Sequence, residues 1–294
     1  MHKKTTNNLH RQISNDAMNY IYKYIDTDIN IDELSLSFNI SKFHFHKIFK
    51  EQMGANIYAT IKSIRLQKAS NLLITNKTST ITEIANMCGY SSQTSFIRAF
   101  KIRFNQTPTK WKKGGYKEYS NEILKNSKLK LFSLEEFPNI QVKVVKTQSQ
   151  KAYYIRQKGY NGDEIREVWQ KMTAWIYTNN IKEYKEIGIY HDNPVITPHE
   201  ECLYIAVVVP KNDEEIINTN LPHFEIPEAL YATFDLRGRY GDMLRLVQWA
   251  YHEWLPKSGY ETTTNPSFAE FRKNHFCEES GEFDATFYLP IRYV

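Results

Sequence analysis

Apolar residues in the N-terminal third of the chain recur at the spacing of amphipathic helices. Between Asp16 and Ile25 they lie three or four positions apart, which predicts a helix with one buried face. Residues 31–51 and 81–104 each hold a short periodic run, a tight turn and a second periodic run, and residues 57–74 form a long periodic stretch between them. The pattern predicts two helix-turn-helix units in tandem, joined by a rigid connecting helix.

The second helix of each predicted unit combines an apolar face with a polar one. Phe45, Ile48 and Phe49 form the apolar face in the first unit. A helix that enters the major groove of DNA contacts base edges with its outward residues, and a solvated polar surface is the alternative. The outward residues predicted to contact DNA are Phe43, His44, His46, Lys47 and Lys50 in the first unit, and Gln93, Thr94, Arg98, Lys101 and Arg103 in the second.

Beyond the helical part, the pattern changes to short strand-like runs with two helices, near residues 162–177 and 241–255. A lysine-rich stretch with weak periodicity and the pair Gly114-Gly115 lies before these runs. We therefore predict an all-α tandem helix-turn-helix domain followed by an α+β domain. The predicted bounds are 10–113 for the helical domain, 114–133 for a linker and 134–294 for the α+β domain.

The two parts of the chain differ in charge. Residues 1–120 hold 18 Lys and Arg against 8 Asp and Glu, a net charge of +10, and residues 121–294 hold 20 against 25, a net charge of −5. A polyanion is therefore the expected partner of the first part only. The charge agrees with double-stranded DNA as the partner that the helix-turn-helix pattern predicts.

Cysteine usage and the absence of long apolar runs indicate the compartment. Cys88, Cys202 and Cys277 are odd in number, far apart and not in a metal-ligand spacing, which predicts reduced thiols rather than a zinc site. No run approaches the roughly 18 apolar residues of a membrane span. The polar residues 1–12 lack the apolar core of a secretory signal and are expected to form a tail. We expect a cytoplasmic protein with no metal, no cofactor and no membrane partner.

The second part of the chain repeats itself at an offset of eighty residues. Three landmarks recur at this offset, the pairs Tyr160 and Tyr240, Trp169 and Trp249, and Pro210 and Pro290. We predict two copies of a strand, helix, strand, strand unit that pair about a pseudo-twofold axis. A groove between the copies is a natural ligand site.

The offset also aligns Tyr190 with Glu270. If both side chains point into the groove, an acid faces a wall of aromatic residues, which suits an apolar cation. Buried core aromatics and an ordinary surface acid are the alternative interpretation. The predicted ligand-binding residues are Tyr153, Tyr160, Trp169, Tyr190, Trp249, Glu270 and Tyr288.

Residues 13–113 resemble the DNA-binding domain of the AraC/XylS family of bacterial regulators. The second unit matches over residues 84–101 and through Phe104, Thr107 and Pro108, and the first through Ser41, Phe49-Lys50 and Gly54. Asn105 departs from the family, which usually has glycine there, but Asn tolerates a left-handed backbone. The resemblance implies that base contacts fall on Phe43, His46, Lys47, Gln93, Thr94 and Arg98.

Residues 134–294 resemble the GyrI-like effector-binding domain of bacterial multidrug-responsive regulators. The matching segments are residues 154–160, 187–194, 226–232 and 254–260, with Phe268-Ala269-Glu270-Phe271. Glu270 falls where that family has the acid of its ligand cavity. The order of the two domains is that of Rob-like regulators.

Together these features predict a transcription regulator whose second domain binds an amphipathic, cationic small molecule. The resemblance to the AraC/XylS family implies that it is an activator. RNA polymerase is a further candidate partner. Two alternatives are a small-molecule hydrolase, in which Glu270 and a tyrosine activate water, and a module that sequesters a protein. No set of nucleophile, base and orienting residue is recognisable in the sequence, so we predict that the chain is not an enzyme.

Overall fold

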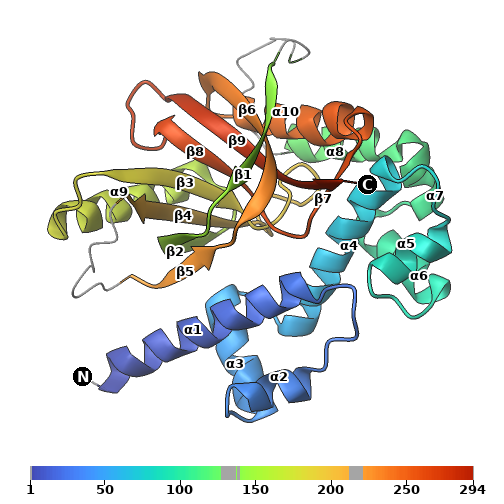
Figure 1. Cartoon of the computed structure of the whole chain (residues 1–294), viewed down its shortest axis with the longest axis horizontal. Helices are drawn as coiled ribbons and strands as arrows, with labels where there is room; N and C mark the ends of the chain where they lie inside the picture. Colours follow the sequence, from blue (N-terminus) through green and yellow to red (C-terminus); the bar gives the residue numbers. More distant parts are fainter. Residues whose placement is uncertain (1, 127–136, 138–139, 212–220, 294) are drawn as a thin grey trace. The chain divides into compact units, whose positions relative to one another are not determined.

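The computed structural model describes residues 2–126, 137, 140–211 and 221–293 (Figure 1). Contacts within the chain divide it into two compact units, Met1–Lys113 and Gly114–Val294. The described residues of the first unit form helices and connecting turns, and those of the second form a sheet with helices. This architecture confirms the predicted fold class of a helical domain followed by an α+β domain.

The first unit begins with a helix that is longer than predicted, α1 (His2–Lys23). Residues 2–12, expected as a polar tail, continue the helix because growth from an existing turn costs little and neither Pro nor Gly interrupts the segment. The buried stripe of α1 includes Ile13, Ala17 and Ile21. The other helices of the unit are α2 (Ile31–Ser37), α3 (Lys42–Met53), α4 (Ile57–Thr75), α5 (Ile81–Met87), α6 (Gln93–Phe104) and α7 (Pro108–Lys110).

Helix caps fix where the two helix-turn-helix units begin and end their helices. The Ser41 hydroxyl accepts a hydrogen bond from the backbone N–H of His44 at the start of α3, and Ser92 caps α6 in the same way. Thr80 and Glu83 form a capping box at the start of α5. At the end of α6, Asn105 adopts the left-handed conformation expected of it, with φ at 51°.

One glycine lets the second helix-turn-helix unit approach the segment that follows α1 and the connecting helix α4. Gly89, in the turn between α5 and α6, has φ at 74°, and a Cβ there would lie 2.8 Å from the carbonyl oxygen of Ile25. The guanidinium of Arg65 on α4 fills the same space and donates to that carbonyl at 3.0 Å. Only glycine allows this close approach of two backbones and one side chain.

The sheet of the second compact unit, Gly114–Val294, has the order β1-β6-β9-β8-β3-β4-β2-β5, with β7 paired to β9. The strands β2, β4 and β3 of one half match β6, β9 and β8 of the other, and β3 and β8 meet at the centre, which confirms the predicted duplication. The elements are β1 (Val142–Thr147), β2 (Gln150–Lys158), α9 (Gly162–Thr178), β3 (Tyr184–Tyr190), β4 (Leu203–Pro210), β5 (His223–Ile226), β6 (Ala229–Arg239), α10 (Asp242–Trp249), β7 (Tyr260–Thr262), β8 (Ser267–Lys273) and β9 (Glu282–Tyr293).

The two halves exchange their edge strands. β1 leads directly into β2 and β5 leads directly into β6 (Figure 1), yet β1 pairs with β6 and β5 pairs with β2. The pairs Thr147↔Ala229 and Gln150↔Ile226 keep one register across the bends. The four strands therefore form one long antiparallel ribbon that links the two ends of the sheet.

Helices and ribbon pack on opposite faces of the sheet. On the helix face, the indole N–H of Trp169 on α9 donates to the hydroxyl of Tyr204 at 3.1 Å, and the ring of Trp249 on α10 lies 6.1 Å from that of Phe234. The other face, called the ribbon face, carries Ile187 and Glu270, and a buried cluster joins its apolar residues to those of the ribbon. Because strand residues alternate between faces, register decides which side chains share a surface.

Residues 116–126 were predicted as linker but form helix α8 (Tyr116–Asn126), which packs within the second unit. The side-chain amide of Gln248 on α10 donates to Ser120 at 3.0 Å, and Lys117 pairs with Glu253 at 2.6 Å. Ser120 and Leu124, four positions apart, form the buried side of the helix. Because most of the other residues of the helix are polar, the sequence shows no clear apolar periodicity there. Residues 127–133 of the predicted linker lie outside the described residues.

Candidate functional site

The residues predicted to contact DNA lie on α3 and α6. On α3, Phe43 is 82% exposed, and His44, Lys47 and Lys50 are also exposed. His46 is half-buried, with its ring 5.4 Å from that of Tyr58. The apolar residues Phe45, Ile48 and Phe49 are buried, as their spacing predicted.

Helix α6 repeats this division between an exposed and a buried face. Gln93, Thr94, Arg98 and Lys101 are exposed, whereas Arg103 is half-buried, with its guanidinium 5.6 Å from the centre of the Phe104 ring. The helix contains no Asp or Glu. Among the described residues, Arg98 forms no ion pair, so its guanidinium is available to a partner.

The predicted ligand-binding residues do not meet at one place. Tyr190 pairs with Ser267 on β8, three positions before Glu270, so the two side chains point to opposite faces of the sheet. The prediction that Glu270 faces Tyr190 is therefore wrong. Five of the seven predicted residues pack on the helix face: Tyr153, Tyr160, Trp169, Tyr190 and Trp249. Only Glu270 and Tyr288 lie on the ribbon face.

Beside Glu270 the ribbon face carries an aromatic group that the sequence interpretation missed. The rings of Phe268 and Tyr288 stack with centroids 4.5 Å apart, and the ring of Tyr231 lies edge-on to both. Burial raises the pKa of Tyr288 to about 12, and the nearby Glu270 carboxylate adds to that rise. An acid and three aromatic rings thus share the ribbon face. Of these three rings, Tyr288 alone was among the predicted ligand-binding residues.

The Glu270 carboxylate is paired with a cation from the neighbouring strand. The ammonium nitrogen of Lys185 on β3 lies 3.3 Å from Oε2 of Glu270. Both side chains remain partly exposed, at 37% for Lys185 and 26% for Glu270. The pair is therefore accessible from solvent.

A network of charged side chains continues the ribbon face on the side of Glu270 away from the aromatic rings. The guanidinium of Arg272 donates to Asp284 at 2.6 Å and to the Thr286 hydroxyl at 2.6 Å, and it lies 3.3 Å from Asp235. Burial alone would raise the pKa of Asp284, but hydrogen bonds from Arg272 and Arg237 outweigh it and lower that pKa. The network belongs to strands β6, β8 and β9.

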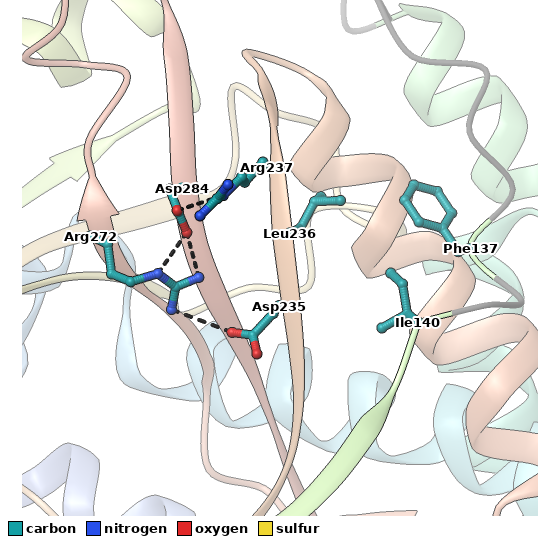
Figure 2. Close-up of a pocket in the computed structure, with 7 residues that line it drawn as sticks. All are labelled: Phe137, Ile140, Asp235, Leu236, Arg237, Arg272 and Asp284. Carbon is teal, nitrogen blue, oxygen red and sulfur yellow. Dashed lines mark hydrogen bonds and ion pairs between the residues drawn. The ribbon is translucent and has the colours of Figure 1, made fainter.

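A pocket of about 590 Å³ opens over this network. Figure 2 shows the charged residues on one side and the apolar side chains of Phe137 and Ile140 on the other. Arg272, two positions after Glu270 on the same strand, lines the pocket, whereas Glu270 itself does not. The lining residues are Phe137, Ile140, Asp235, Leu236, Arg237, Arg272 and Asp284.

Within residues 2–126, 137, 140–211 and 221–293, no three His, Cys, Asp or Glu side chains lie together as metal ligands would. None of the helices described there is both long and apolar enough to cross a membrane.

Family models match both units of the chain. Residues 140–292, more than half of the chain, match the GyrI-like small molecule binding domain. The chain belongs to the GyrI-like family. Residues 34–114 match a helix-turn-helix domain, in front of the GyrI-like domain. The resemblance of the N-terminal part to AraC/XylS regulators, followed by a GyrI-like domain, is confirmed.

Individual relatives match between 35% and 42% of this chain. The xylose operon regulatory protein of Escherichia coli (strain K12) is 35% identical over 108 residues, which are 37% of this chain and 26% of that protein. The probable transcription factor PqrA of Proteus vulgaris is 34% identical over 109 residues, 35% of this chain and 88% of that protein. A DNA gyrase inhibitor of Erwinia billingiae (strain Eb661) is 29% identical over 127 residues, 42% of this chain and 80% of that protein. The chain thus spans about a quarter of the xylose operon protein, 26% of its length.

Proposed function

We propose that the protein is a sequence-specific transcription regulator whose GyrI-like domain binds an amphipathic, cationic small molecule. Activation is the expected direction of control, and RNA polymerase is the expected further partner. The observation that carries the proposal is the pairing, in one chain, of two exposed basic helices in tandem helix-turn-helix units with an acid beside aromatic rings on the GyrI-like sheet. A cytoplasmic location is part of the proposal.

The DNA-binding half of the proposal rests on α3 and α6. Each presents a polar and basic face at its N-terminal end, and each buries the opposite face in the unit's core. Recognition helices of helix-turn-helix proteins use outward residues near their N-termini on base edges, and the basic residues beyond them neutralise phosphates. Because one chain holds two such helices, a monomer is sufficient to contact two major-groove segments.

The effector half rests on the surroundings of Glu270. A partly exposed carboxylate attracts a cation, and the pocket over the neighbouring Arg272 network has Ile140 in its apolar wall. Tyr288 and Phe268 stack beside the acid, and aromatic faces stabilise cations within about 6 Å. An effector that combines a positive charge with apolar surface fits both features.

The test is a fluorescence-anisotropy titration of a duplex that carries the protein's own upstream region, at two salt concentrations, with and without tetraphenylphosphonium. We expect tight, salt-sensitive binding whose affinity shifts when the cation is added. Glu270→Gln is expected to bind the duplex as tightly and to lose the shift. Binding no tighter than to a random duplex would contradict the regulator proposal.

Sequestration of a protein is the second candidate function. A relative that matches 42% of this chain is named a DNA gyrase inhibitor. In addition, Phe268 and Tyr231 are almost fully buried, at 3% and 1% exposure, so most of the aromatic group is packed in the core. Inhibition of DNA supercoiling by purified gyrase on addition of the chain, unchanged in Glu270→Gln, would favour this candidate.

A hydrolase is the third candidate, and a direct assay of catalytic turnover distinguishes it from the other two. Turnover of a generic ester by the protein, lost in Glu270→Gln, would favour it. We expect no turnover, because Glu270 is paired with Lys185 rather than with a nucleophile that it could activate.

A further inference from the structure

We propose that Lys185 is a resident counter-cation of the effector site, which a cationic effector must displace from Glu270. The inference rests on the proposed function, because it assigns a specificity-determining residue to the same site. It follows from the position of Lys185, from the contacts of the neighbouring cations and from the chemistry of the exchange.

Lys185 lies where a bound cation would lie. On the central strand pair, Glu270 is opposite Ile187, and Lys185 stands two positions before Ile187 on the same face. Its ammonium nitrogen reaches Oε2 of Glu270 at 3.3 Å. The protein's own ammonium therefore pairs with the carboxylate that a cationic effector would need.

Lys185 is also the cation of this surface that leaves most easily. Arg272 is held by Asp284, Asp235 and Thr286 together. By contrast, Glu270 supplies the one polar contact that the Lys185 side chain makes within the described residues. Lysine carries a compact charge on a flexible four-carbon stem, so its ammonium can move into water without disturbing the strand.

The need to displace Lys185 affects which kinds of cation the site prefers. A monovalent effector that pairs with Glu270 replaces one cation by another, and the released ammonium is hydrated at the surface. The exchange yields little net electrostatic free energy, since partly exposed ion pairs are weak. Affinity must then come from apolar contacts around the acid, such as those with the ring of Tyr288. Lys185 thus favours lipophilic cations over small hydrated ones.

The experiment measures the affinity of the full chain for tetraphenylphosphonium by isothermal titration calorimetry. Lys185→Met removes the competitor, keeps the apolar stem and is expected to tighten binding by roughly three- to fivefold, the range that a partly exposed ion pair permits. Lys185→Arg keeps the charge and is expected to bind as the unaltered protein does. Lys146→Met is the matched control, since Lys146 forms an ion pair of 2.7 Å with a different acid, Glu228.

A second background separates the inference from the proposed function. In Glu270→Gln, the cation is expected to bind weakly, and Lys185→Met is expected to have no further effect. If Glu270→Gln weakens binding but Lys185→Met does not tighten it, the inference fails and the proposed effector site stands. If Glu270→Gln leaves the affinity unchanged, or if no variant binds the cation, both fail.

Discussion

Arg98 lies exposed in the second turn of α6, in a position where a recognition helix meets base edges. We expect Arg98→Ala to weaken binding to the specific duplex by roughly 1 to 3 kcal/mol, because a bidentate contact from Arg to guanine is lost. Anisotropy titrations with specific and random duplexes measure the change. Lys62→Ala, which removes an exposed cation from α4, is the control and is expected to retain discrimination between the duplexes. Equal discrimination in Arg98→Ala would remove the assigned role.

At the scale of single residues, the sequence predicted helices better than strands. Helical spacing alone placed Phe45 and Phe49 inside and Lys47 outside, and the structure agrees. In the sheet, a shift of one residue moves a side chain to the other face, so an alignment of Tyr190 with Glu270 did not reveal that they point apart. The partner of Glu270 is 85 positions away, and no local pattern identifies it.

Among the secondary-structure elements, the end of α6 offers a test of backbone strain. Asn105 is exposed and has φ at 51°, a conformation that costs a residue with a Cβ about 1 kcal/mol or more, and Asn less. We expect Asn105→Ala to lower the free energy of unfolding by about 1 kcal/mol. Asn105→Gly is the matched control and is expected to change it by less than about half of that. Urea unfolding of the fragment 1–113, followed through its single tryptophan, Trp111, measures both.

Helix α8 shows why some elements cannot be predicted from the sequence alone. Its exposed positions carry mostly Lys, Glu and Asn, and its buried stripe is completed by a serine rather than by large apolar residues. Its partners on α10 are more than a hundred positions away in the chain. Tertiary contact, rather than local periodicity, fixes this helix.

At the scale of the whole molecule, the packing of α8 predicts where a stable fragment of the second domain must begin. The bounds 10–113, 114–133 and 134–294 stay predictions, and the packing of α8 suggests that the second domain includes it. We expect a fragment of residues 114–294 to melt roughly 3 to 10 °C above a fragment that begins at residue 128, because the shorter one exposes the surface that Leu124 covers. Differential scanning calorimetry compares the two. Equal melting temperatures would show that α8 adds nothing to the domain.

The exchange of edge strands also bears on how the duplicated domain arose and folds. β1 completes the sheet of the second half, and β5 completes that of the first. A single copy of the repeat would leave a strand edge unpaired, and exchange of that strand with an identical chain is one way to cover it. The pairing seen here is the one expected if the domain arose by fusion of the two chains of such a swapped homodimer. We expect the same linkage to couple the unfolding of the two halves.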